Sequence, residues 1–239
     1  MKSIEKRPLK TLFSVLLAAT LILIPGATLA QVEVGVVGGM AFAGRQDVTI
    51  EQRNAQGMVT SVTHEPGLHV DRGRAWGLTM VRWSRHRPLI GLSLDVLYWA
   101  NSLRIVPVDA PQAHRTVRQD RGGIFSSLAG RIPITPEGDT CIYGAIGMGV
   151  VDSHLIGGDH RLGAGLTMAA GGSVPLMQDK LVAHLEARYL ITHDFDSDDS
   201  MNQNLEFSGA PSWTTARRVF GPHQDTRFLP MTLGLSWRF

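Results

Sequence analysis

Residues 229–239 read LPMTLGLSWRF, and their side chains alternate between two kinds. Every second residue is large and apolar, whereas the residues between them are mostly small or polar. The apolar set is Leu229, Met231, Leu233, Leu235, Trp237 and Phe239. A period of two is typical of a β-strand, whose successive side chains point to opposite faces. The apolar face has no break and ends in aromatic residues, so this strand needs an apolar environment outside itself.

The first 30 residues have the features of a secretory signal peptide. A basic region comes first, with Lys2, Lys6, Arg7 and Lys10. The apolar run TLFSVLLAATLILI follows, and PGATLA ends the segment with small residues. The run has about 14 residues, fewer than the roughly 20 that a spanning helix needs, so an uncleaved anchor is the weaker alternative. We therefore expect a signal peptide at 1–30, cleaved before Gln31, and an exported domain at 31–239.

The exported domain has almost no net charge. Subtracting the four basic residues and one acidic residue of 1–30 from totals of 23 and 21 leaves 19 basic and 20 acidic residues. The basic pI of the whole chain therefore gives no reason to expect nucleic acid as a partner. Cys141 is the only cysteine, so no intrachain disulfide stabilises the domain despite its export.

Alternation with a period of two recurs in eight segments of the exported domain. They are 32–43, 74–84, 89–100, 122–132, 141–152, 162–174, 181–193 and 228–239. No apolar run after Ala30 reaches 18 residues, which excludes helical membrane spans. In the second segment, Arg82 falls on the apolar face unless a β-bulge shifts the register there.

The connections between these segments alternate in length. Those after the first, third and seventh segments are long, with about 30, 21 and 34 residues, whereas those after the second, fourth and sixth are short. An even number of alternating strands joined in this way is typical of an outer-membrane β-barrel. Because no water reaches backbone groups in lipid, the sheet has to close, and the last strand has to pair with the first. A soluble β-sandwich is the structural alternative.

The sequence resembles the OmpA/OmpX-like outer-membrane β-barrel domain family over essentially all of 31–239. IYGAIGMGV and HLEARYLI resemble the family's interior strands. LGLSWRF, with Trp237 and Phe239, resembles the terminal signal that the barrel-assembly machinery recognises. The resemblance implies an all-β fold, an eight-stranded antiparallel transmembrane barrel in the outer membrane of a Gram-negative-type envelope. It also implies contact with outer-membrane lipid, including lipopolysaccharide, and with the assembly machinery.

The interior of an eight-stranded barrel is just wide enough to be filled by side chains. The inward positions carry charges of both signs, at Glu33, Asp95, Arg131, His184, Glu186, Arg188 and Arg238. Buried charges persist only when they are paired, so we expect a structural network of ion pairs. Within it, Glu33 and Arg238 have inward parity on the two closing strands and are expected to pair. The alternative is a narrow channel for ions or small apolar solutes.

A lipid A-modifying enzyme is a second alternative, and the histidines argue against it. Lipid A deacylases carry a His-x-Ser pair on a strand, and none of the nine histidines here is followed at the second position by serine. HEPGLH, at 64–69, lacks the HExxH spacing of a zinc site. The acidic run 194–199 lacks the glycine and glutamate of a calcium loop, and weak divalent binding is the most it suggests. We predict no catalytic residue, cofactor or metal site.

The long connections are expected to carry the function, through an extracellular ligand that the sequence does not identify. Arginines lie where two of them re-enter the membrane, at Arg115, Arg118, Arg121 and Arg227. Guanidinium groups bind phosphate through paired hydrogen bonds, so we expect these four residues to contact lipid heads. In the first long connection, VTIEQ and MVTSVTHE flank the turn-rich RNAQG, which predicts a projecting hairpin across 48–65.

Overall fold

The computed structural model describes most of the exported domain. The described residues are 31–43, 46–53, 58–68, 72–84, 89–105, 115–136, 140–155, 160–177, 180–194, 203–206, 215–219 and 226–239. The predicted signal peptide at 1–30 lies outside them and stays a prediction. Within the described residues, no helix is long and apolar enough to cross a membrane.

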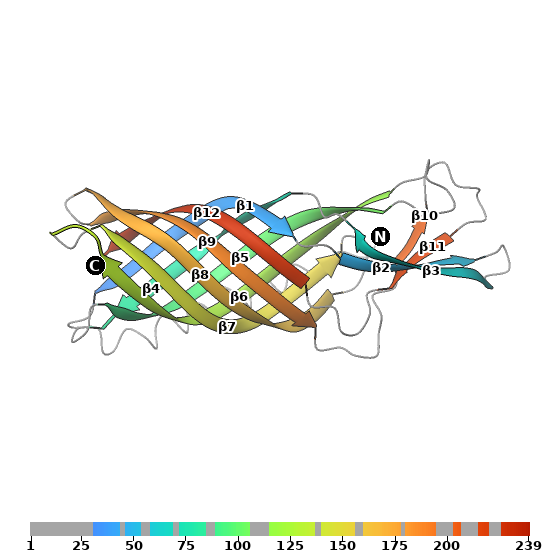
Figure 1. Ribbon diagram of the computed structural model, residues 1–239, viewed down its shortest axis with the longest axis horizontal. Helices are drawn as coiled ribbons and strands as arrows, with labels where there is room; N and C mark the ends of the chain where they lie inside the picture. The colour runs from blue at the N-terminus through green and yellow to red at the C-terminus, as the bar shows by residue number, and fades with distance from the viewer. Residues whose placement is uncertain are drawn as a thin grey trace, which may run out of the picture.

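Eight strands form one closed antiparallel barrel in the order β1-β12-β9-β8-β7-β6-β5-β4 (Figure 1). They are β1 (Val32–Ala43), β4 (Gly73–Trp83), β5 (Ile90–Ile105), β6 (Arg115–Pro133), β7 (Cys141–Leu155), β8 (His160–Met177), β9 (Leu181–Asp194) and β12 (Thr226–Arg238). The first strand pairs with the last over eleven residue pairs, from Glu33↔Arg238 to Ala43↔Phe228. The predicted eight-stranded barrel is therefore confirmed, and the β-sandwich alternative is wrong.

The predicted strand limits agree best at one end of the barrel. We call this end, where β4 joins β5 and where Phe239 lies, the turn end, and the opposite end the loop end. At the loop end, β5 and β6 remain paired as far as Ile105↔Arg115, well beyond the apolar alternation. Backbone pairing continues there without an apolar face, because beyond the lipid nothing requires one.

Arg82 lies on the outer face without a bulge. The β4–β5 register runs without a shift from Arg74↔Ala100 to Trp83↔Gly91, with Arg82 opposite Leu92. The arginine is the last but one residue of β4, and a long side chain at a strand end can extend its charged group toward the interface.

A second, four-stranded sheet has the order β10-β11-β2-β3 and is drawn beyond the loop end in Figure 1. Its strands are β2 (Gln46–Arg53), β3 (Val59–Leu68), β10 (Gln203–Glu206) and β11 (Thr215–Val219). β2 and β3 form the predicted antiparallel hairpin, and residues 54–57 between them lie outside the described residues. The two strands from the last long connection were not predicted, because neither shows a sustained alternation.

The barrel's two faces follow the alternation. Outward side chains are apolar and exposed, among them Val36, Met148, Leu166 and Leu233. Apolar surface of this extent is not found on soluble monomers and indicates contact with lipid. Inward side chains are buried, including the polar and charged ones.

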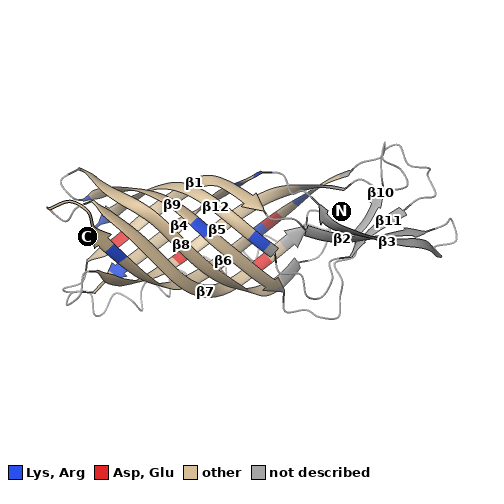
Figure 2. Cartoon of the chain, in the orientation of Figure 1, with Lys and Arg blue, Asp and Glu red and all other residues tan. Residues whose placement is uncertain are grey.

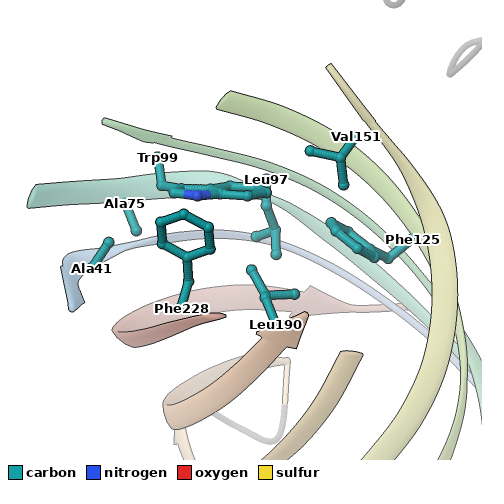
Figure 3. Close-up of a cluster of buried hydrophobic side chains, with 8 residues drawn as sticks. All are labelled: Ala41, Ala75, Leu97, Trp99, Phe125, Val151, Leu190 and Phe228. Carbon is teal, nitrogen blue, oxygen red and sulfur yellow. The ribbon is translucent and has the colours of Figure 1, made fainter. Parts of the chain in front are cut away.

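An apolar cluster fills the lumen toward the loop end, and we call it the apolar plug (Figure 3). Its residues are Ala41, Ala75, Leu97, Trp99, Phe125, Val151, Leu190 and Phe228, from seven of the eight barrel strands. The ring centroid of Trp99 is 5.6 Å from that of Phe228 and 6.5 Å from that of Phe125, distances that favour aromatic packing. The remaining strand, β8, contributes Gly165, where a Cβ would lie 2.7 Å from Phe125 Cε1 and 2.9 Å from Val151 Cγ2.

Gly165→Ala should lower the free energy of unfolding by about 1–3 kcal/mol, because the added methyl group overfills the plug. Gly38→Ala is the matched control, since a Cβ there has no atom within 4 Å on the outer face. This variant should be neutral or slightly stabilising, because alanine reduces the entropy of the unfolded chain. Equilibrium urea unfolding in lipid vesicles measures both changes. Equal losses for the two variants would contradict the packing account.

Candidate functional site

The lumen at the turn end contains a cluster that joins the two closing strands. Glu33 Oε1 accepts hydrogen bonds from Arg238 Nε at 3.0 Å and from Arg131 Nη1 at 3.4 Å. Arg131 also donates from Nη2 to Gln31 Oε1 at 2.8 Å, and its Cζ lies 4.2 Å from the centre of the Trp83 ring. The expected pair of Glu33 and Arg238 is thus present, with Arg131 as a second cation.

Two different features of the fold bring these charges together. Glu33 and Arg238 are direct partners in the β1–β12 register, so strand closure alone places them side by side. Arg131 belongs to β6, which is not a neighbour of β1, so its side chain has to reach across the lumen. We call the three residues the closing-strand cluster.

A second network lies deeper in the lumen. Arg188 donates from Nη1 to Asp95 Oδ2 and from Nε to Glu186 Oε1, both at 2.8 Å. Tyr143 donates its hydroxyl to Glu186 Oε2 at 3.1 Å, and Thr79 donates to Asp95 Oδ1 at 2.6 Å. Asp95 is 1% exposed and Arg188 6% exposed. Because each charge has an opposite charge and a further donor or acceptor, burial of this central network is tolerated.

His184 lies in the same part of the lumen. Its Nε2 is 2.5 Å from Ser236 Oγ, and its ring meets Tyr143 edge-on with 6.2 Å between centroids. A histidine beside a serine is the arrangement that activates a nucleophile. Ser236, however, is only 2% exposed, so its hydroxyl has little access to a substrate. The contact is accounted for by satisfaction of two buried polar groups.

The structure thus places all seven predicted lumenal residues inside the barrel: Glu33, Asp95, Arg131, His184, Glu186, Arg188 and Arg238. Figure 2 shows charged residues of the barrel toward both ends and at a level between them. Tyr143 and Ser236, which sequence reasoning did not select, share the inward parity of neighbouring glycines, and that parity is the signal that could have found them.

A cavity of about 50 Å³ lies among these polar side chains. Residues from both networks line it, including Glu33, Arg131, Tyr143, Glu186 and Arg188. One water molecule needs about 10–15 Å³ by this measure, so the cavity accommodates a few waters. It is therefore suited to hydrating the ion pairs.

Arg121 points into the lumen of the barrel and not toward the lipid, where it was predicted to lie. It is 5% exposed and points into the lumen, with Nε donating to Ser153 Oγ at 3.1 Å and Cζ lying 4.4 Å from the Phe228 ring centre. Its register partner Trp99 shares this inward parity. The prediction that Arg121 contacts lipid heads is therefore wrong.

The other predicted lipid contacts differ in what the structure describes. Arg118 and Arg227 lie exposed on the outer face at the loop end. Arg118 Nε is bound to Asp120 Oδ1 at 2.8 Å. The side chain of Arg115 lies outside the described part of the chain.

The chain end is built into the barrel. The backbone N–H of Phe239 donates to Val32 O at 2.8 Å, and that of Arg238 donates to Lys180 O at 2.7 Å. Trp237 and Phe239 are both exposed on the outer face at the turn end. Aromatic residues at this level are typical of the girdle of a transmembrane barrel. Their role as an assembly signal stays a prediction.

The structure describes little of the two sequence motifs that resemble metal sites, 64–69 and 194–199. The side chains of His64, Glu65 and Asp194 are not described, and His69 and 195–199 lie outside the described residues altogether. Among the residues whose positions are described, no group of three or more potential metal ligands is present.

The structure has the features that define an outer-membrane β-barrel. It is a closed antiparallel barrel with an apolar outer face and a polar lumen, and its connections are short at the end that holds Phe239. No protein-family model and no curated protein sequence matches the chain.

Solved outer-membrane barrels resemble the structure at low sequence identity. OprG from Pseudomonas aeruginosa has a TM-score of 0.45 and 12% identity, over 86% of this chain and 95% of that one. Neisserial surface protein A has a TM-score of 0.44 and 10% identity, over 87% and 97%. Ail, the attachment invasion locus protein of Yersinia pestis, in complex with the heparin analogue sucrose octasulfate, has a TM-score of 0.43 and 12% identity, over 89% and 100%. At this level of sequence identity and TM-score, the functions of those proteins cannot be assigned to this chain.

Arg188→Met should lower the free energy of unfolding by about 3–5 kcal/mol, because it leaves Asp95 as an uncompensated buried charge. Arg238→Met should have a much smaller effect, because Arg131 remains as a partner for Glu33. Urea unfolding in lipid vesicles provides both values, and the reverse order would refute this account of the lumen. A double-mutant cycle with Glu33→Gln and Arg238→Gln should show a coupling free energy between the two positions, because the two side chains are joined by an ion pair in the lumen, whereas additive effects would mean no interaction.

Proposed function

We propose that the protein is a non-enzymatic outer-membrane barrel that acts through its external four-stranded sheet. The observation that carries the proposal is the origin of that sheet. β2 and β3 come from the first long connection, β10 and β11 come from the last, and β11 pairs with β2 from Thr215↔Arg53 to Val219↔Thr49. Two connections far apart in the sequence thus build one structure, which supports a role for that structure itself.

The lumen supports the same conclusion, because its side chains pair with one another. The polar groups toward the turn end form ion pairs, and the apolar plug occupies the section above them. An eight-stranded barrel leaves little room beyond its side chains. The barrel is thus a membrane support for what lies outside.

The topology of the external sheet suggests a class of partner. Among the described residues, β3 and β10 are its two edge strands, and each pairs on one side there. Unpaired backbone groups at a sheet edge can receive an extended segment of another protein as an additional strand. β3, with ten residues, is the longer edge. We infer that the partner is an extracellular protein that offers an extended segment.

A narrow channel is the second candidate, and the cavity toward the turn end, which charged residues line in part, favours it. In this case, the apolar plug would act as the gate, since it lies between the cavity and the loop end.

The wild-type protein should show no steady conductance in a planar bilayer, because the apolar plug fills the lumen. The double variant Trp99→Ala and Phe228→Ala should allow ion passage by removing two rings that pack against each other in the lumen. Leu229→Ala is the matched control, because this neighbour of Phe228 faces outward. A conducting wild-type protein would establish the channel instead of the proposed function.

Replacing 46–68 by a short Gly-Ser linker tests the role of the external sheet. Cells that export the full chain should bind at least one of a panel of immobilised extracellular proteins that contain extended segments, and the variant should lose that binding. The variant should retain heat-modifiable mobility on gels, because none of the barrel strands is altered. Binding that persists without the hairpin would contradict the proposal.

Lipid A from the same cells should keep its mass, because the protein is proposed to be non-enzymatic. A change in the mass of lipid A that the Ser236→Ala variant abolishes would instead show that the protein is an enzyme.

A further inference from the structure

Three arginines lie on the outer face at the loop end, on or beside the two strands that flank β1. Arg74 is exposed on β4, opposite the outward Met40 on β1. Arg72 immediately precedes β4, and its Cζ lies 5.8 Å from the ring centre of Phe42 on β1. Arg227 is exposed on β12, the other neighbour of β1. Because β4 and β12 flank β1, their backbones are two strand spacings apart, about 10 Å, and Arg74 is level with Met231, four residues or about 13 Å along β12 from Arg227. Arg72 lies two residues nearer the loop end than Arg74, so long side chains from the two flanking strands can approach one another over β1.

These three guanidinium groups have no carboxylate partner among the described residues. Arg118, on β6 at the same end, differs because Asp120 binds it at 2.8 Å. The charge around the rim is also unequal. Where described, the outer face of β7, β8 and β9 near the loop end has no arginine or lysine, and it carries Asp152 and His193. Positive charge is therefore concentrated on the β12–β1–β4 side.

Aromatic and apolar side chains locate the lipid interface just below the arginines. Trp76 follows Arg74 by two residues on the same face and is 55% exposed. Its ring centroid is 5.2 Å from that of Tyr98 on β5, and such outward aromatic residues form the girdle at a membrane interface. Met40, which is level with Arg74, and Leu229, two residues from Arg227 toward the turn end, continue the apolar surface on β1 and β12. The arginines thus lie at the level of the lipid head groups, above a surface suited to acyl chains.

We propose that Arg72, Arg74 and Arg227 bind the phosphate of a phosphorylated glycolipid in the outer leaflet. A guanidinium group forms parallel hydrogen bonds with phosphate oxygens, and several donors around one phosphate give a defined site. The apolar surface below accepts the acyl chains of the same molecule. A free phosphate ion would use the arginines alone, so the aromatic and apolar residues favour the lipid as the occupant.

The test measures binding of bisphosphorylated lipid A to the purified full-length protein in detergent micelles by thermophoresis. The triple variant Arg72→Gln, Arg74→Gln and Arg227→Gln should bind at least about tenfold more weakly, which corresponds to about 1.4 kcal/mol. Arg118→Gln is the matched control and should change affinity by less than about twofold, because Asp120 already neutralises this arginine. Heat-modifiable mobility verifies that each variant is folded, and Arg74→Gln alone should show a partial loss.

Two further arms distinguish the source of the phosphate. Dephosphorylated lipid A should bind the wild-type protein as weakly as lipid A binds the triple variant, and millimolar inorganic phosphate should not displace lipid A. Unchanged affinity in the triple variant, or an equal loss in Arg118→Gln, would overturn the site. Equal binding of the dephosphorylated lipid, or displacement by inorganic phosphate, would overturn its assignment to a phosphorylated lipid.

Discussion

The structure depends on one constraint, which is that each backbone N–H and C=O group inside a membrane needs a hydrogen-bond partner within the protein. The constraint rules out a free sheet edge, and the barrel meets it by pairing β1 with β12 over the full length of β1. Once the sheet is closed, the alternation of side chains gives every strand one face toward lipid and one toward the lumen. The apolar outer face and the polar lumen are both results of that closure.

The lumen shows how a narrow barrel keeps charges away from lipid. Its central network surrounds Arg188 with the carboxylates of Asp95 and Glu186, so that no charge is buried alone. The apolar plug lies above this network and excludes water from the section nearer the loop end. Two kinds of packing therefore share one interior, with ion pairs where backbone parity brings opposite charges together and aromatic rings where Gly165 leaves space.

The barrel was predictable from the sequence because its signal is periodic and the same in every strand. The parity of Glu33 and Arg238 was sufficient to predict their ion pair, since each lies near the end of a closing strand. The sequence context alone places Arg121 wrongly in a loop, because β6 extends to Arg115, beyond the apolar alternation, and its parity turns Arg121 into the lumen. β10 and β11 could not be predicted, because the pairing that forms them is between segments distant in sequence and leaves no local alternation.

The seam between β1 and β12 also has a consequence for how fast the protein folds. Arg238 and Glu33 are 205 positions apart, so the contact that completes the barrel is among the most distant in the chain. The entropy lost in closing a loop grows with its length, and folds dominated by distant contacts form slowly. Until the seam forms, β1 and β12 are both free edges that can pair with another chain. Closure of the seam is thus expected to be slow, and the chain is exposed to aggregation until it occurs. A folding catalyst that acts before closure therefore has the greatest effect.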